Sequence, residues 1–485
     1  MLEHPALASR PVYLDYNATT PVDPRVVEAM HGALSADFGN PSSTHAYGEG
    51  PRRLLARARA QVAALLGAHP GEIVFIASGT EADALTVRGA VLARASSMFG
   101  RPHVVTQVTE HPAVLSACAH LRRWHDVDVT YVDVDRHGRV DPHDVRAAMT
   151  PSTVLVTVMH ANNETGTMQP IADIAEVTRS RGVLLHTDAA QSAGKVALDV
   201  DDLGVDLLTV VGHKMYAPKG MAILYVRDGV TLEPLVGGGD QERGLRAGTE
   251  NVALAVALGT AADLAERALA AGETARLTAL RDQLHAQLAA RLPGHVHLHG
   301  HPTHRLPNTL NVRVDGITGL RASRRRPRGR RVHGCRVPLG RAPALVRTAR
   351  SRCDPPAGLG AVRLSLGRWT TPGAVSTASS ALAMAAGSVE VGRTSPRAGH
   401  DTSGRGDREA GLLRGVTVDH ERAVPATARR LPMDEDDLVS MRRQGGEHGG
   451  RGVDERAELP PPQREHSVLH RQVARSRPVP VGRRE

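Results

Sequence analysis

Lys214 is the residue of this sequence best suited to covalent chemistry. The chain has only three lysines, Lys195, Lys214 and Lys219, among its 60 lysines and arginines. A lysine kept against such a bias indicates a task that arginine cannot perform. Forming a Schiff base is one such task, because a guanidinium never supplies a neutral nitrogen. Lys214 also follows the apolar run 205–211, which is typical of a buried strand. The sequence therefore predicts that Lys214 binds a cofactor covalently.

Other polar residues follow other apolar runs in the same manner, namely His111, Asn163 and Asp188 with Gln191 close behind it. The carboxyl ends of parallel strands open onto one crevice where ligands bind, so we expect these side chains to line the same site as Lys214. A carboxylate there keeps a pyridinium nitrogen protonated and strengthens an electron sink, and an imidazole stacks on a planar cofactor. Taken singly, Asp188 is equally typical of a helix cap, and a lone histidine such as His111 is more often a cap or a surface residue.

The segment FIASGTEADALTVRGA predicts a strand end, a turn of small residues and then a helix. Free N–H groups and the helix dipole at Gly79 and Thr80 favour a bound phosphate, and the Thr80 hydroxyl adds a donor. The alternative is an ordinary helix start with Glu81 in its first turn.

The elements that position these residues are short apolar runs alternating with helical patterns, which is typical of a mostly parallel sheet covered by helices. Most runs lack polar alternation, as expected for strands buried on both faces. The runs are 72–76, 103–106, 129–132, 154–159, 183–187, 207–211 and 222–226. Leucines, alanines and a valine at helical spacing over 54–66 predict a helix that ends at Gly67. A second leucine stripe over 277–288, stopped by Pro293, predicts a helix of a smaller domain.

We therefore expect three parts. Residues 1–260 hold an N-terminal arm and a large cofactor domain, and residues 261–390 form a smaller α+β domain. Residues 391–485 are rich in Arg, Gly, Pro, Asp and Glu without apolar periodicity. Such a tail buries too little surface to offset its ordering entropy, so a disordered basic tail is predicted.

The cysteine count and hydropathy exclude several classes of protein. Cys118, Cys335 and Cys353 form no CxxC pair and no even set. Neither a zinc site nor a disulfide framework is indicated, and no metal is expected. No run of about 18 apolar residues occurs, so we expect no membrane span and a cytoplasmic protein.

Nine segments of the chain match the motifs of one known family. They are YLDYNATTPVDP, FGNPSSTH, SGTEAD, TEHPAVL, HANNETG, HTDAAQ, GHKMYAPKG, ERGLRAGTEN and VRLSLGRWTT. In these segments the chain resembles the cysteine desulfurases of the class V aminotransferase group. The resemblance implies a fold-type I chain that uses pyridoxal 5'-phosphate (PLP), with a seven-stranded, mostly parallel sheet in its large domain. It also implies L-cysteine as substrate.

Matched position by position, the resemblance implies roles for the strand-end residues. Lys214 forms the Schiff base with PLP and moves a proton, and Asp188 pairs with the pyridine nitrogen. Gln191 contacts the ring oxygen, His111 stacks on the ring, and Asn163 lies beside it.

The same matching implies further binding residues. Gly79, Thr80 and His213 hold the phosphate, and Arg363 binds the substrate carboxylate, a task suited to a bidentate guanidinium. Thr249 reaches the phosphate of the other subunit, which implies a homodimer. The sulfur then passes to an acceptor protein, such as an iron–sulfur scaffold or a tRNA-thiolating enzyme.

One segment, 321–357, departs from the family pattern. The family carries a mobile loop resembling STGSAC, whose cysteine takes the sulfur as a persulfide, but the chain reads GRRVHGCRVPLGRAP there. If the coding sequence of Val332–Gly340 is read one nucleotide out of frame, it can encode Ser-Thr-Gly-Ala-Ala-Cys-His-Ser, which is close to the family loop. A shifted frame of a GC-rich gene also explains the run of arginines in this segment. Two alternatives stay open: a natural variant loop, and Cys335 acting as the nucleophile.

Two other functions stay open as well. One is a PLP-dependent aminotransferase or lyase reaction without a cysteine nucleophile. The other is nucleic-acid binding through the arginines of 321–331 and the basic tail, which predicts an affinity that falls steeply with salt. We expect no specific nucleic-acid partner, because the net charge of +9 is carried disproportionately by the later part of the chain.

Overall fold

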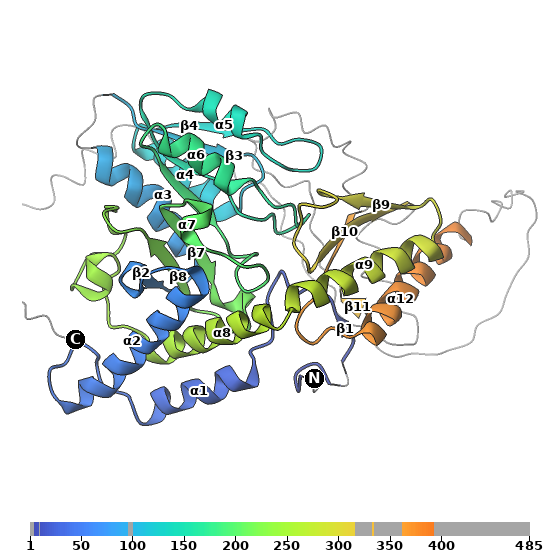
Figure 1. The fold of residues 1–485 in the computed structure, drawn as a ribbon, viewed down its shortest axis with the longest axis horizontal. Helices are drawn as coiled ribbons and strands as arrows, with labels where there is room; N and C mark the ends of the chain where they lie inside the picture. Colours follow the sequence, from blue (N-terminus) through green and yellow to red (C-terminus); the bar gives the residue numbers. More distant parts are fainter. Residues whose placement is uncertain (1–3, 9, 96–99, 316–331, 334–360, 392–485) are drawn as a thin grey trace, which may run out of the picture. The chain divides into compact units, whose positions relative to one another are not determined.

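The computed structural model describes residues 4–8, 10–95, 100–315, 332–333 and 361–391 (Figure 1). All of them belong to one compact unit, Met1–Gly399. The anomalous segment 321–357, with Cys335 and Cys353, lies outside the described residues apart from 332–333. The expected tail 391–485 also lies outside them apart from Val391, so its disorder stays a prediction.

A seven-stranded sheet forms the centre of the larger part of the fold (Figure 1). Its strand order is β2-β8-β7-β6-β5-β3-β4. The bounds are β2 (Ile73–Ile76), β3 (His103–Gln107), β4 (Asp128–Val132), β5 (Thr153–Thr157), β6 (Leu184–Asp188), β7 (Leu207–Val211) and β8 (Ala222–Val226). Only β8 runs in the direction opposite to the other six strands, which confirms the predicted mostly parallel sheet.

The predicted runs and the observed strands agree to within two residues at every end. Glu72 belongs to a 3-10 turn, Pro70–Glu72, and not to β2. The run 154–159 ends as a strand at Thr157, because the N–H of Met159 donates to the Glu110 carboxylate, 2.5 Å away, and not to a neighbouring strand.

Helices cover both faces of this sheet. The helices of this larger part are α1 (Pro24–Ser35), α2 (Ala46–Leu66), α3 (Gly79–Ala95), α4 (Pro112–Trp124), α5 (Pro142–Ala148), α6 (Ile171–Arg179), α7 (Val200–Leu203) and α8 (Val252–Ala270). Two further helices, α9 (Glu273–Arg291) and α12 (Pro372–Val391), belong to the smaller part. Successive side chains of a strand point to opposite faces. In β2, Val74 and Ile76 pack with α3 and α4, whereas Ile73 and Phe75 pack with α2, α6 and α8. Helix α2 ends at Gly67 in a left-handed cap, as predicted.

A second core surrounds a three-stranded antiparallel sheet of β9 (Val296–His299), β10 (Thr309–Val314) and β12 (Ala361–Ser365). The leucine stripe of α9, from Leu277 to Leu288, packs here with residues of α12, which confirms the predicted smaller α+β region. The expected boundary at residue 260 falls inside α8, whose Ala261 and Ala265 pack in the larger core. We therefore propose a division at residues 271–272, where α8 ends.

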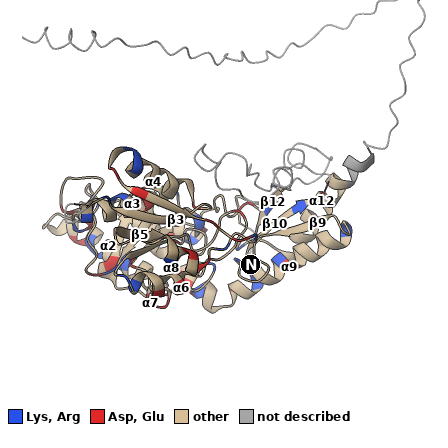
Figure 2. Ribbon diagram, turned by 90° about the horizontal axis from the view of Figure 1, so that it is seen from above, with Lys and Arg blue, Asp and Glu red and all other residues tan. Residues whose placement is uncertain are grey.

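Charged residues of both signs are mixed over the described helices and loops (Figure 2). Several form ion pairs with one another, such as Arg227 with Asp201 at 2.8 Å and Arg276 with Glu273 at 2.6 Å. None of the helices in the described part combines the length and the hydropathy needed to cross a membrane.

Candidate active site

Lys214, Asp188, Asn163 and His111 follow four strands that are neighbours in the sheet, β7, β6, β5 and β3. The sequence predicted this juxtaposition, and the structure places them there. The ring of His111 and the carboxylate of Asp188 each offer an atom within 4.8 Å of the other. The strand ends therefore form one site.

Lys214 lies at the end of β7, with its Nζ 2.5 Å from the Asn17 carbonyl oxygen and 3.1 Å from that of Ala18. Burial, and next the Arg363 guanidinium, lower the pKa of Lys214 to about 8. A neutral amine is then accessible near neutral pH, as nucleophilic chemistry requires. The other two lysines have different surroundings. Lys195 is buried and donates to the Gln191 carbonyl, whereas Lys219 is exposed.

Asp188 is buried, and one carboxylate oxygen accepts from the N–H of Ala190 at 2.8 Å. Burial raises its pKa, whereas the hydrogen bond from Ala190 and the charge of Lys214 favour its charged form. His111 caps α4, since its Nδ1 accepts from the N–H of Ala113 at 3.2 Å. The cap fixes Nδ1 as an acceptor, and burial lowers the pKa of the ring, so His111 stands beside Asp188 as a neutral imidazole.

Asp83 also belongs to this cluster, although the sequence did not single it out. Its carboxylate, 2% exposed, lies within 4.8 Å of His111 and Asp188, and its Oδ1 has no hydrogen-bond partner. Burial, and next the charge of Asp188, raise its pKa well above the usual range. Asp83 lies on α3, which is apolar on most sides, so no polar stripe marked it in the sequence.

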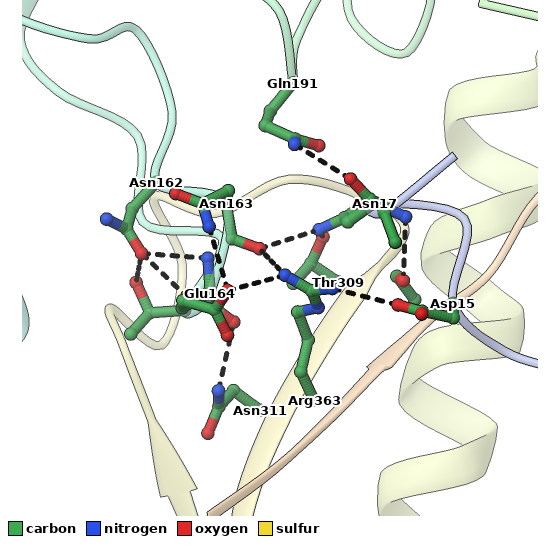
Figure 3. Close-up of polar contacts among 12 residues, drawn as sticks. Asp15, Asn17, Asn162, Asn163, Glu164, Gln191, Thr309, Asn311 and Arg363 are labelled. Carbon is green, nitrogen blue, oxygen red and sulfur yellow. Dashed lines mark hydrogen bonds and ion pairs between the residues drawn. The ribbon is translucent and has the colours of Figure 1, made fainter. Parts of the chain in front are cut away.

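Asn17 connects the N-terminal arm to the site and was likewise not predicted. Its carbonyl oxygen accepts from Lys214 and, at 3.1 Å, from Gln191 Nε2. Its side chain donates to Thr309 Oγ1 at 2.9 Å and accepts from Asn308 at 3.0 Å. Asn17 therefore connects Lys214 and Gln191 to the smaller sheet; Figure 3 shows the bond from Gln191 to Asn17 and the neighbouring Thr309. It lies in the matched segment YLDYNATTPVDP, which was the only signal for it.

The start of α3 offers the predicted anion site. Within the described residues, the backbone N–H groups of Gly79 and Thr80 have no acceptor, whereas that of Glu81 bonds to Ser78 Oγ at 3.1 Å. A Cβ at Gly79 would stand 2.5 Å from Val211 Cγ2, so β7 requires a glycine here. His213 follows β7, two residues after Val211; its Nδ1 lies 3.1 Å from Thr19 Oγ1, and burial lowers its pKa to about 4.

Thr249 is exposed and lines a cavity of about 250 Å³ together with Ile76 and Ala77, just before Gly79. The loop that carries it is tied to β2 through Glu242. That carboxylate binds Arg59 at 2.7 and 2.8 Å and accepts from the N–H of Phe75 at 2.9 Å.

We expect Glu242→Ala to destabilise the protein by about 3 kcal/mol or more, because it leaves the Arg59 guanidinium without its buried partner. Urea denaturation of the purified variant measures this loss. Glu49→Ala is the matched control, since Glu49 is 60% exposed and lies 3.8 Å from Arg53. That control should cost below about 1 kcal/mol. Equal losses in the two variants would contradict the assignment of Glu242 as an anchor.

Arg363 lies on β12 with its side chain 5% exposed. It faces the strand ends of the larger sheet, where its Nη1 donates to the Asn163 carbonyl at 3.0 Å and to Glu164 Oε1 at 2.6 Å (Figure 3). Its Nη2 donates to Asp15 Oδ1 at 2.9 Å. The side-chain amide of Asn163 donates a hydrogen bond to the same Glu164 Oε1 at 2.8 Å. The predicted substrate residue therefore lies in the same site as Asn163.

The one cysteine among the described residues is Cys118, a buried residue of α4. Burial raises the pKa of its thiol to about 12, so it does not ionise near neutral pH. Cys118 is therefore unsuited to be the nucleophile.

The sequence profile of the class V aminotransferases matches residues 12–371, on both sides of the anomalous segment. The chain belongs to the class V aminotransferase family. Among curated members, it is 47% identical over 310 residues to the cysteine desulfurase of Trichormus azollae, covering 64% of this chain and 75% of that one. It is 46% identical over 309 residues to the cysteine desulfurase of Gluconacetobacter diazotrophicus, covering 64% of this chain and 76% of that one.

Solved structures agree with this membership. A NifS-like protein superposes with a TM-score of 0.69 at 31% identity, covering 77% of this chain and 98% of that one. A structure of SspA in complex with cysteine gives a TM-score of 0.63 at 33% identity, covering 74% of this chain and 99% of that one. Class V aminotransferases of this fold-type I group use PLP, and this chain is PLP-dependent.

The residues present fit PLP on two observations of this structure. The buried Oε1 of Gln191 has no hydrogen-bond partner, and the N–H groups of Gly79 and Thr80 are free within the described residues. Buried polar atoms are rarely left without a partner unless a ligand or water supplies one. A polar cofactor with a phosphate group would supply hydrogen-bond partners for Gln191 Oε1 and for the N–H groups of Gly79 and Thr80.

Proposed function

We propose that this chain acts on L-cysteine as a cysteine desulfurase. The reaction moves the sulfur of L-cysteine to a thiol, which becomes a persulfide, and leaves L-alanine. The observation that carries the proposal is the convergence of Lys214, Asp188 and His111 at neighbouring strand ends with the buried Arg363 facing them. Incubation of the purified protein with L-cysteine and a reducing thiol tests it, with alanine and sulfide measured in equal amounts. Loss of L-cysteine without sulfide would reject it.

In this proposal the phosphate of PLP is held by the N–H groups of Gly79 and Thr80, with His213 beside them. A helix start with free N–H groups favours an anion, and α3 supplies one. Thr249 reaches the phosphate of a second subunit, so the active form is a homodimer. Its exposed position supports contact with another chain.

When bound, PLP withdraws electrons from the substrate α-carbon. Asp188 would keep a proton on the pyridine nitrogen, Gln191 would contact the ring oxygen, and His111 and Asn163 would confine the ring. Lys214 would hold PLP covalently through Nζ, and its amine would move the substrate proton. Its pKa of about 8 suits a base that works near neutral pH. Arg363 binds the substrate carboxylate.

We place the nucleophile of this reaction in the segment 321–357, which apart from residues 332–333 lies outside the described residues. A second function, PLP-dependent aminotransfer or lyase chemistry without a thiol, is favoured by the only described cysteine, Cys118, being buried with a raised pKa. The products separate the two: sulfide with alanine for desulfuration, and pyruvate or a keto acid for the alternative. A reducing cytoplasm and a sulfur-acceptor protein complete the proposal.

Asp188→Asn should retain PLP but lose roughly two or more orders of magnitude in rate. Removing a charged partner from a developing carbanion costs about 3 kcal/mol or more. Turnover of L-cysteine at matched PLP content measures the loss. An Asp188→Asn protein with near-native turnover would rule this role out.

A further inference from the structure

Arg363 is held by two carboxylates at once. Its Nη2 binds Asp15 at 2.9 Å and its Nη1 binds Glu164 at 2.6 Å, so both terminal nitrogens of the guanidinium are engaged (Figure 3). End-on bidentate recognition of a carboxylate uses the same two nitrogens. An incoming substrate carboxylate therefore meets an internal competitor.

The two carboxylates exceed the charge of the single guanidinium. Burial raises the pKa of Glu164, and Asp15 adds to the rise, whereas Arg363, the Asn163 amide and Lys214 oppose it. Glu164 is thus an anion that the site stabilises incompletely. The charged groups that face it are Arg363, Asp15 and Lys214.

Asp15 and Glu164 differ in how firmly they are tied to Arg363. The backbone of Asp15 pairs with Ser365, two residues from Arg363 on the same strand, and the Ser365 N–H donates to the Leu14 carbonyl at 2.9 Å. Asp15 therefore moves with Arg363. Glu164 lies in the loop after β5, where its N–H donates to Asn162 Oδ1 and its carbonyl accepts from Asn311, each at 3.0 Å. Its backbone is therefore fixed as well, but among the described residues its side chain bonds only to Arg363 and Asn163. Its longer side chain also has more torsions through which to swing away.

We propose that Glu164 occupies the place of the substrate carboxylate on Arg363 and is displaced when an amino acid binds, which makes it a specificity-determining residue. The inference rests on the proposed role of Arg363. An amino acid brings an α-ammonium group with its carboxylate, and the displaced Glu164 pairs with that cation. A ligand with a carboxylate alone offers no such compensation, so Glu164 selects against it.

Propionate tests the inference, because it carries the carboxylate, lacks the amine and does not react with PLP. Isothermal titration of the PLP-loaded protein measures its dissociation constant. Glu164→Gln should bind propionate about tenfold more tightly than the natural chain, since one competing charge is gone. Glu273→Gln is the matched control, because the Glu273–Arg276 pair is also 2.6 Å long and lies on α9. That control should leave the constant unchanged.

The natural chain provides a second test that needs no variant. Ionised Glu164 competes and protonated Glu164 does not, so propionate affinity should fall as pH rises from about 5.5 to about 7.5, where propionate stays largely ionised. In Glu164→Gln this slope should be smaller. A flat profile in the natural chain, or a Glu164→Gln constant equal to that of Glu273→Gln, would overturn the inference.

Arg363→Lys separates this inference from the proposed function, because lysine cannot bind a carboxylate through a fork. If Arg363→Lys binds propionate as tightly as the natural chain, Arg363 does not hold the carboxylate and the proposed role fails. If Arg363→Lys loses propionate while Glu164→Gln gains nothing, only the competition by Glu164 is wrong.

Discussion

Lys214→Ala is expected to abolish covalent attachment of PLP and to lower turnover of L-cysteine at least about a thousandfold. The methyl group offers no nitrogen for the bond to PLP and no base for the substrate proton, and removing a positioned base alone costs about 10² to 10⁴ in rate. The variant should lose the visible absorbance of the bound cofactor and release free PLP on dialysis.

Lys219→Ala is the matched control for this change. Lys219 is exposed and only five positions further along the chain, so its loss should leave absorbance and turnover unchanged. Lys195 is the stricter competitor, because burial lowers its pKa to about 7. Retention of covalent PLP in Lys214→Ala, together with its loss in a Lys195 variant, would reassign the site.

The chain as written is expected to bind PLP but to release sulfur from L-cysteine poorly. The residues of the cofactor site precede the anomalous segment, whereas the nucleophile belongs inside it. Replacing residues 332–339 by STGAACHS, with the flanks 321–357 restored in the same frame, should raise sulfide production roughly a hundredfold or more. Loss of a catalytic nucleophile costs several powers of ten in other enzymes.

The matched control for the restored loop carries serine in place of its cysteine, as STGAASHS. It should bind PLP equally well and stay as inactive as the chain as written. Mass spectrometry after reaction with L-cysteine locates the persulfide. A persulfide on Cys335 of the chain as written, formed at a rate comparable to that of the restored protein, would overturn the frameshift account and make Cys335 the nucleophile.

The sequence predicted the larger sheet and the strand-end residues because both depend on local patterns. Apolar runs with polar residues directly after them predicted the positions of His111, Asp188 and Lys214, and the parallel sheet brings such ends together. The reversed direction of β8 was not predictable, since an apolar run does not reveal its direction.

The remaining site residues act over long separations in the chain. Asn17 bonds to Asn308, 291 positions away, and Glu164 pairs with Arg363, 199 positions away. No local periodicity marks such partners. Asp83 was missed for another reason, because a carboxylate on a buried helix contradicts the usual rule that buried carboxylates are paired.

Peptide mapping after borohydride reduction tests the central claim most directly. The protein as purified with PLP is reduced, digested and analysed by mass spectrometry for the pyridoxyl phosphate group. We predict that this group is found on Lys214, in the peptide that contains GHKMYAPKG. Its presence on Lys195 or Lys219, or its absence from all three lysines, would contradict the site described above.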